Sequence, residues 1–420
     1  MADQAGARRR LNAAFPSAGR PGLLRPLSHL LLAFVVATPM ALADGASAPS
    51  SQPSSQSEVE AALVRAIMLL RESGLKSALA EIEQIVAKAP NFRLGHLIKG
   101  DILMAYAGTP VAFGPVSSTS SGIAPLQHEA RVRLQRFLDA PPPDFLPQPL
   151  LQLSAWQEHA VLIDTSRSRL YVFANDNGKP RYVTDFYISV GKNGVDKQRE
   201  GDQRTPIGVY TITSSKEKLP DFYGAGAFPI SYPNDWDVRH GRNGHGIWLH
   251  GTPSETYSRP PLATDGCVVL TNDDLARLTR FVDVGRTPVV ISHRVDWQAP
   301  GRWDLDRAAF MASFEKWRAD WESNQVDAYL GHYSPRFSSD GKNLAAWTAH
   351  KRKVAAGKSW IKVNVPTMSA VAYPGVEMEM MMVTFEQDYR SNNLSNRTFK
   401  RQYWIREGDA WRILHESVIS

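Results

Sequence analysis

The sequence predicts a multidomain α+β protein in which a helical region precedes two domains rich in strands. Apolar residues recur every three or four positions between Glu58 and Ala107, which is the period of an α-helix. From His159 onward, short apolar runs separated by polar turns are typical of strands. A last unit, residues 304–420, begins with a helical pattern and continues with four strand-like runs. A chain of 420 residues is long enough for two or three such domains.

The first residues have the features of an export signal. Residues 1–43 are arginine-rich at the start and contain an apolar run from Leu30 to Ala37. Small residues at Ala41 and Ala43 fit the pattern that precedes signal cleavage. The run is much shorter than the roughly 20 residues that a stable membrane span needs. We expect a signal peptide at residues 1–43, export to the periplasm and no membrane span after cleavage. The alternatives are an uncleaved anchor and a disordered start.

Composition and charge narrow the class of partners. Hydrophobic residues make up 43% of the chain and charged residues 21%, which excludes wholesale disorder. The formal net charge is +6, of which residues 1–43 supply +4 because they hold five arginines against one aspartate. The remaining chain carries about +2, which is too little to indicate a nucleic-acid partner.

A Ser/Pro-rich linker is predicted at residues 44–57, and a helical region at residues 58–150. Within it, residues 74–108 resemble a tetratricopeptide-like helical hairpin. Such a region either docks a protein partner or caps the next domain. After a loop at residues 108–123 we expect a helix from Gln127 to Leu138 and then a stiff proline-rich spacer, residues 141–149.

The sequence pattern of residues 159–293 is typical of a β-rich domain. Residues 160–174 hold two apolar runs joined by a polar turn, which predicts a hairpin. Further strand-like runs are residues 181–191, 205–213, 246–251, 267–272 and 287–292. A helix is expected to begin at the polar residues Asn272, Asp273 and Asp274.

The last unit, residues 304–420, places four aromatic residues at helical spacing: Phe310, Phe314, Trp317 and Trp321. Strand-like runs follow at residues 359–373, 376–389, 398–407 and 410–416. In the second run, Glu377 and Glu379 alternate with methionines up to Met382, as expected of sheet core rather than a cofactor site. A leading helix on a curved sheet resembles the nuclear-transport-factor-2-like α+β cone.

The single cysteine, Cys267, is the strongest chemical feature of the sequence. An ordinary thiol is only a few per cent thiolate at neutral pH, so a neighbouring imidazole raises its reactivity. His250 lies 17 positions upstream, where another apolar run meets a loop. Gly266 permits an unusual backbone angle beside the sulfur, and the amides of Gly266 and Cys267 are placed to face an oxyanion. The alternative is that Cys267 is an unreactive thiol buried in the hydrophobic core.

Three blocks in order give this pair a family context: RTPIGVY at residues 204–210, His-Gly-Thr-Pro from His250, and Thr-x-Gly-Cys ending at Cys267. Together they resemble the catalytic domain of L,D-transpeptidases (YkuD-type), over roughly residues 160–292. The resemblance implies a β-rich fold and acyl transfer through a cysteine thioester. The implied substrate is the tetrapeptide stem of peptidoglycan, cut between its third residue and the terminal D-alanine.

The resemblance also implies roles for single residues. Cys267 is the nucleophile, His250 is the general base and later the acid, and the Gly251 carbonyl orients His250. Gly266 and Cys267 supply oxyanion N–H groups. Thr264 occupies the Ser/Thr position before the Gly-Cys pair.

Two positions near the thiol depart from the family pattern. Asp265 stands where many members have histidine, and Val269 where many have Arg or Asn. A carboxylate near a thiol raises its pKa unless it is paired or turned away. Arg204 and Arg259 are candidates for binding a substrate carboxylate, with exposed, solvated side chains as the alternative.

The leading hypothesis is a peptidoglycan L,D-transpeptidase that takes part in cell-wall biogenesis and cell shape. The alternatives are an L,D-carboxypeptidase that passes the acyl group to water, and a non-catalytic scaffold that binds the cell wall. No metal-ligand spacing and no Walker or Rossmann glycine pattern is present, so we expect neither metal nor cofactor. The expected partners are stem peptides, with a protein partner for the helical or C-terminal region as a further hypothesis.

Overall fold

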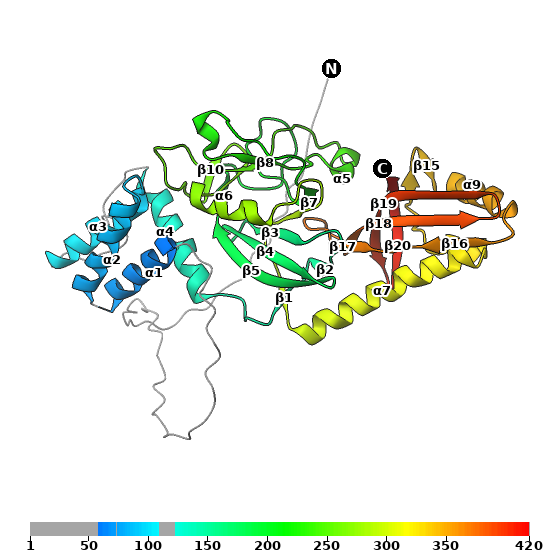
Figure 1. Ribbon diagram of the computed structural model, residues 1–420, viewed down its shortest axis with the longest axis horizontal. Coiled ribbons are helices and arrows are strands. Elements are labelled where there is room, and N and C mark those ends of the chain that lie inside the picture. Colours follow the sequence, from blue (N-terminus) through cyan, green and yellow to red (C-terminus); the bar gives the residue numbers. More distant parts are fainter. Residues whose placement is uncertain (1–57, 73, 109–121, 420) are drawn as a thin grey trace, which may run out of the picture. The chain divides into compact units, whose positions relative to one another are not determined.

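A computed structural model describes residues 58–72, 74–108 and 122–419. The predicted signal peptide and linker therefore lie outside the described residues. Within them the predicted fold class is confirmed: a helical region precedes a β-rich domain and a C-terminal α+β domain (Figure 1). None of the helices in these ranges is both long and apolar enough to cross a membrane.

The helical region consists of α1 (Glu58–Arg71), α2 (Leu75–Lys88), α3 (Arg93–Tyr106) and α4 (Ile123–Leu138). Each helix turns its apolar face to a shared core that includes Leu63, Ile82, Ile98 and Leu126. Helix α4 begins four residues before the predicted Gln127, because Pro125 lies in its first turn, where a missing N–H breaks no helical hydrogen bond.

The predicted proline-rich spacer, residues 141–149, is partly wrong, because Leu146 and Pro147 within it form a strand, and a second strand begins directly after it. Strand β1 (Leu146–Pro147) pairs with β13 (Trp297–Gln298). Strand β2 (Leu150–Gln152) pairs with β17 (Met368–Ala372) and so adds an edge strand to the C-terminal sheet. A short edge strand tolerates a neighbouring proline, which cannot donate to a ladder.

The central domain has two sheets with a core between them. The larger has the order β5-β4-β3-β12-β7, and only the β3–β12 pair is parallel. Its strands are β3 (His159–Asp164), β4 (Arg169–Asp176), β5 (Lys179–Tyr187), β7 (Gly208–Thr211) and β12 (Pro288–Ser292). The smaller sheet has the order β11-β9-β8, with β8 (Ala227–Pro229), β9 (Trp248–His250) and β11 (Val268–Val269).

Short elements complete this domain. They are β6 (Val190–Gly191) paired in parallel with β10 (Leu262–Thr264), the 3-10 turns η1 (Asp221–Tyr223) and η2 (Thr279–Phe281), and helices α5 (Asp235–Arg239) and α6 (Asn272–Leu278). The predicted helix start at residue 272 is confirmed, and the side chain of Thr271 caps it by accepting from the N–H of Asp274 at 3.1 Å.

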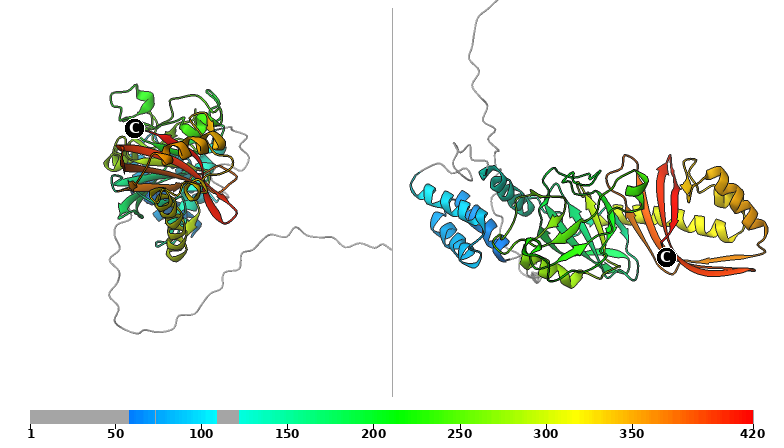
Figure 2. Two further views of the ribbon diagram at one scale, coloured as in Figure 1. Left: turned by 90° about the vertical axis from the view of Figure 1, so that its right-hand side faces the viewer. Right: turned by 90° about the horizontal axis from the view of Figure 1, so that it is seen from above.

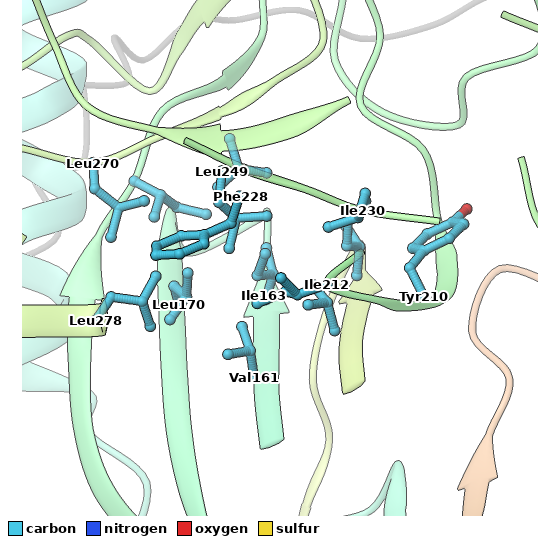
Figure 3. Packing of buried hydrophobic residues seen from close by; sticks show 14 of the residues in the cluster. Val161, Ile163, Leu170, Tyr210, Ile212, Phe228, Ile230, Leu249, Leu270 and Leu278 are labelled. Carbon is cyan, nitrogen blue, oxygen red and sulfur yellow. The ribbon is translucent and has the colours of Figure 1, made fainter. Parts of the chain in front are cut away.

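The core between the two sheets fixes the orientation of β9. Phe228 and Leu249 of the smaller sheet pack over Ile163 and Leu170 of the larger one (Figure 3). Each such buried side chain contributes about 1.5–3 kcal/mol of hydrophobic free energy. Because neighbouring side chains on a strand point to opposite faces, the burial of Leu249 places His250 on the face away from this core.

The C-terminal domain packs helices against a six-stranded sheet. Helix α7 (Pro300–Glu322) runs along one face of the sheet, as Figure 1 and the right-hand view of Figure 2 show. The other elements are α8 (Val326–Leu330), α9 (Leu344–Ala356), β14 (Ser338–Ser339), β15 (Lys342–Asn343), β16 (Ile361–Asn364), β18 (Met380–Ser391), β19 (Leu394–Glu407) and β20 (Ala410–Val418). A cavity of about 280 Å³ in this domain is lined by residues that include Trp321, Tyr329 and Lys351.

The methionine run differs from the predicted alternating strand. Strand β18 begins only at Met380, and Met380, Met381, Met382 and Val383 are all buried. Met380 and Met382 pack against side chains of the central domain, whereas Met381 and Val383 pack against α7. A strand that is covered on both faces has a continuous apolar run instead of an alternating one.

Candidate active site

The parallel pairing of β9 and β11 brings Cys267 and His250 to one place. Val268 is opposite Leu249, and the N–H of Leu270 donates to the carbonyl of His250 at 2.9 Å. Cys267 immediately precedes β11 and therefore lies beside Trp248, two residues from His250 along β9. The backbone N–H of Trp248 donates to the sulfur and stabilises the thiolate form.

His250 is held in one tautomer. Its Nδ1 lies 2.7 Å from the carbonyl oxygen of Gly251, and only 1% of the residue is exposed. A carbonyl only accepts hydrogen bonds, so Nδ1 carries the proton and Nε2 has a free lone pair. The rings of Phe222 and Tyr223 pack beside the imidazole, with centroids at 5.9 and 5.2 Å. Burial lowers the pKa of His250 to about 4, so the ring is neutral at neutral pH.

The residue after His250 has to be glycine because of Asn272. A Cβ on Gly251 would lie 2.1 Å from Asn272 Oδ1. Asn272, the first residue of α6, accepts from the N–H of Ala225 at 2.9 Å and donates to the carbonyl of Thr252 at 2.9 Å. Asn272 thus fixes the backbone that orients His250. The sequence showed it only as the start of a helix and gave no sign of this second role.

Cys267 is partly buried, and its environment contains opposing charges. Burial is the main effect and raises the pKa of the thiol, and Asp265 raises it further, whereas the charges of Arg259 and Lys197 lower it. The sulfur contacts the carbonyl oxygen of Gly246 at 3.4 Å. Asp265 is mostly exposed and forms an ion pair of 2.9 Å with Lys192, which reduces its effect on the sulfur.

The turn before Cys267 requires glycine and is clamped by two threonines. Gly266 has φ +124°, and a Cβ there would lie 2.8 Å from the carbonyl oxygen of Arg204. Thr205 Oγ1 donates to the Gly266 carbonyl at 2.9 Å, and Thr264 Oγ1 donates to the Cys267 carbonyl at 2.7 Å. The N–H of Gly266 donates to Thr264 Oγ1 at 3.1 Å. An oxyanion role for that N–H stays a prediction, and it requires this bond to be released.

The two candidate arginines lie in different surroundings. Arg259 is half-buried, its guanidinium lies 5.0 Å from the centroid of the Phe222 ring, and its charge acts on both His250 and Cys267. Arg204 is exposed and donates through Nη1 to the carbonyl of Val195 at 3.1 Å. The structure therefore places the Arg259 side chain near His250 and Cys267. Arg204 approaches Cys267 only through its backbone carbonyl, which lies against Gly266.

Lys197 is a further residue at the site that the sequence did not single out. Its side chain is buried, forms an ion pair of 2.8 Å with Asp202 and donates to the carbonyl of Arg199 at 3.0 Å. Its charge lowers the pKa of the Cys267 thiol. A lysine in a loop among other charged residues gives no sequence signal, because its burial depends on the fold of residues 192–205. In the described part of the chain no cluster of three or more His, Cys, Asp or Glu side chains is arranged to hold a metal ion.

Comparisons with known families agree with this arrangement. Residues 158–291 match the L,D-transpeptidase catalytic domain family (YkuD), and residues 309–417 match the Cds6 C-terminal NTF2-like domain family. A curated relative, the putative L,D-transpeptidase YafK of Escherichia coli K12, is 31% identical over 86 residues. That match covers 20% of this chain and 31% of YafK, so the chain spans about a third of the length of this relative.

Two solved structures are similar over most of this chain. Bd1075 of Bdellovibrio bacteriovorus is 29% identical with a TM-score of 0.58, and the match covers 66% of this chain and 98% of that one. Pgp2, a helical cell shape determining protein of Campylobacter jejuni, is 25% identical with a TM-score of 0.55. The match with Pgp2 covers 64% of this chain and 95% of that one.

Proposed function

Because the chain carries an L,D-transpeptidase catalytic domain followed by an NTF2-like domain, we propose that it is an exported, cysteine-dependent L,D-transpeptidase of the peptidoglycan stem peptide. In this proposal Cys267 takes the acyl group of the third stem residue and releases the terminal D-alanine. An amine of a second stem peptide then accepts the acyl group. The observation that carries the proposal is the hydrogen bond of 2.7 Å from His250 Nδ1 to the Gly251 carbonyl, which leaves Nε2 free as a base on the strand that pairs with the segment of Cys267.

Acylation begins from a neutral pair. The pKa of Cys267 is raised and that of His250 is lowered to about 4, so both side chains are neutral at neutral pH. In this proposal the thiol turns to Nε2 from the Gly246 carbonyl, which it contacts at 3.4 Å. The thiol proton passes to Nε2 as the sulfur attacks the carbonyl carbon of the third stem residue. When the tetrahedral intermediate collapses, the C–N bond breaks and the leaving amine of D-alanine takes the proton from Nε2.

Deacylation reverses these roles. His250 accepts a proton from the incoming amine, the new C–N bond forms, the C–S bond breaks, and the sulfur takes the proton back. The N–H of Cys267 is the proposed oxyanion donor, joined by that of Gly266 if it leaves Thr264. Arg259 is the proposed partner of a substrate carboxylate. A similar role for Arg204 requires that its guanidinium leave the carbonyl of Val195.

Transfer to water is the second candidate function and would make the protein an L,D-carboxypeptidase. The observation that favours it is Val269, which is buried where many family members have Arg or Asn. No polar side chain at that position is available to hold an acceptor peptide. The third alternative is a non-catalytic scaffold, which requires an inert Cys267. Failure of a thiol reagent to label Cys267 would favour this alternative.

Export and a role in cell shape belong to the same proposal. Residues 1–43 have the pattern of a signal peptide, and peptidoglycan stems lie outside the cytoplasmic membrane. The likeness to Pgp2, a helical cell shape determining protein, supports a role in shape.

The test is incubation of the mature chain with purified disaccharide-tetrapeptide, followed by mass analysis. Crosslinked dimers indicate transpeptidation, whereas tripeptide with free D-alanine alone indicates carboxypeptidation. Cys267→Ala should abolish both while the circular dichroism spectrum stays unchanged. Full turnover by Cys267→Ala would overturn the mechanism.

A further inference from the structure

The segment of residues 251–261, between His250 and β10, is in contact with the helical region. The ring of Tyr257 lies 4.7 Å from that of Phe92 and packs on the core of α1–α4. Asn91 Nδ2 donates to the carbonyl of Ser254 at 3.0 Å. Phe92 and Asn91 lie far outside the catalytic-domain match at residues 158–291. A region separate from the catalytic domain therefore forms part of the support for an active-site segment.

Helix α4 makes the most buried of these contacts. Glu129 is 1% exposed and accepts a hydrogen bond of 2.7 Å from Ser258 Oγ. It also accepts from Arg133 Nε and Nη2 at 3.1 and 3.0 Å. The Arg133 guanidinium stacks 3.7 Å from the centroid of the Tyr187 ring, whose hydroxyl donates to the Arg259 carbonyl at 2.8 Å. Helix α4 thus contacts Ser258 directly, through Glu129, and contacts the backbone of Arg259 indirectly, through Tyr187.

Buried charges fix α4 against the larger sheet. Arg133 Nη1 donates to Glu60 at 2.9 Å, and Arg169 of β4 donates to the same carboxylate and contacts Asp185 of β5 at 3.3 Å. Burial raises the pKa of Glu60, but Arg169 and Arg133 outweigh it and lower that pKa to about 2. A buried charge is tolerated only when it is paired, so displacing α4 would leave buried charges without partners, and the network favours the observed arrangement.

The segment that α4 holds carries a charge to the reacting pair. The Arg259 guanidinium lies over the Phe222 ring, and Phe222 lies beside the His250 imidazole. The Arg259 charge also lowers the pKa of the Cys267 thiol. The position of this charge therefore depends on where residues 257–259 are held.

We propose that Glu129 and Arg133 of α4 are positioning residues of the catalytic site. They hold residues 257–259 so that the Arg259 guanidinium stays beside Cys267 and His250. The helical region thereby affects the reactivity of the thiol, although it lies outside the catalytic domain. This inference rests on the proposed function only in taking Cys267 as the reacting thiol.

The test is the pH dependence of Cys267 alkylation by iodoacetamide in the mature chain, where one cysteine gives one labelling site. Ser258→Ala removes the contact with Glu129 without removing a charge. Its alkylation midpoint should rise by half a pH unit or more, so that the rate at neutral pH falls about threefold or more. Ser258→Thr keeps the hydroxyl and should restore the wild-type midpoint. An unchanged midpoint in Ser258→Ala overturns the proposal.

Arg136→Gln is the matched control. Arg136 lies in the same helix and pairs with Asp185 at 2.5 Å, so it joins α4 to the sheet without contacting residues 257–259. It should lower stability and leave the midpoint unchanged. An equal shift in Arg136→Gln would mean that general loosening of α4 is responsible, which overturns the proposal.

A double-mutant cycle identifies the route. Arg259→Gln alone should raise the midpoint, and adding Ser258→Ala should change it no further, because both act through one guanidinium. Additive shifts overturn the proposal. Since alkylation needs no peptidoglycan, the expected shifts together with inactivity on stem peptides would refute the proposed function and leave the positioning role standing.

Discussion

Thr205 Oγ1 donates a hydrogen bond of 2.9 Å to the carbonyl of Gly266 and accepts one of 2.9 Å from the N–H of Gly191. One fully buried hydroxyl thereby joins three segments of the catalytic domain at the turn that carries Cys267. This threonine belongs to the RTPIGVY block, and the hydrogen bonds give a physical reason for the residue type at that position.

Thr205→Val should loosen the turn while it preserves the volume of the side chain. Two buried polar groups lose their partner, so the free energy of unfolding should fall by about 1–3 kcal/mol. Acylation of Cys267 by stem peptide should also slow, because the sulfur and its amide move with the turn. Chemical denaturation and single-turnover mass analysis measure the two effects. Thr205→Ser keeps the hydroxyl and should retain both properties; a wild-type acylation rate in Thr205→Val contradicts the clamp.

Gly266→Ala should be more damaging than an alanine at another glycine with positive φ. At φ +124° the new Cβ would lie 2.8 Å from the Arg204 carbonyl oxygen, which forces the turn to move. We expect at least a tenfold loss of acylation rate. Gly241→Ala is the control, since Gly241 has φ +70° with no atom within 4 Å of the added Cβ. That control should lose about 1 kcal/mol of stability and no activity. Equal activity in the two variants would refute the requirement.

His250 should make the protein less stable as the pH falls from about 6.5 to about 4. Burial lowers the pKa of the folded-state imidazole from 6.5 to about 4, so in this range the unfolded chain binds a proton that the folded chain does not. The difference corresponds to about 3 kcal/mol, present above pH 6.5 and lost toward pH 4. Urea denaturation at pH 7 and pH 4.5 measures it. In His250→Asn this part of the pH dependence should be absent; equal pH dependence in both proteins would contradict a buried, neutral imidazole.

Asp265 should have little effect on the thiol while Lys192 is present. Asp265→Asn removes a carboxylate that raises the pKa of Cys267, but this carboxylate is exposed and paired at 2.9 Å. We expect the alkylation rate at neutral pH to rise less than about threefold, and less at high salt. Lys192→Gln leaves the carboxylate unpaired and should lower the rate instead. A large increase in Asp265→Asn would show that the carboxylate is turned toward the sulfur.

Local sequence patterns predicted much of the catalytic core. Two apolar runs joined by a polar turn located the β3–β4 hairpin, and the flexibility of glycine explained the turn at Gly266. The order of the three motif blocks indicated Cys267 and His250, whose roles remain proposals. Sequence patterning failed at the start of β18, where glutamates alternate with methionines from Glu377 to Met382. That alternation indicated a half-buried strand, but β18 begins only at Met380 and residues 380–383 are all buried, because the central domain covers one face and α7 the other.

Sequence reasoning treated the two candidate arginines alike, and only the fold separates them. Arg204 follows a loop whose own carbonyl at Val195 binds its guanidinium, whereas Arg259 lies over Phe222 beside the imidazole. Neither partner is a neighbour in the sequence. Asn272 and Lys197 were missed for the same reason, since each acts on residues that reach it only through folding.

The sequence by itself determined the order of helical and strand-rich regions and the local chemistry of a glycine-flanked thiol with an upstream histidine. These properties depend on residues within a short stretch of sequence, at most 17 positions for His250 and Cys267, where periodicity, turn preference and motif spacing act directly. The tertiary structure decided which charges reach that thiol and what holds them there. Ser258 and Glu129 are 129 positions apart, and their contact exists only because buried ion pairs and a shared apolar core fix α4 against the catalytic domain.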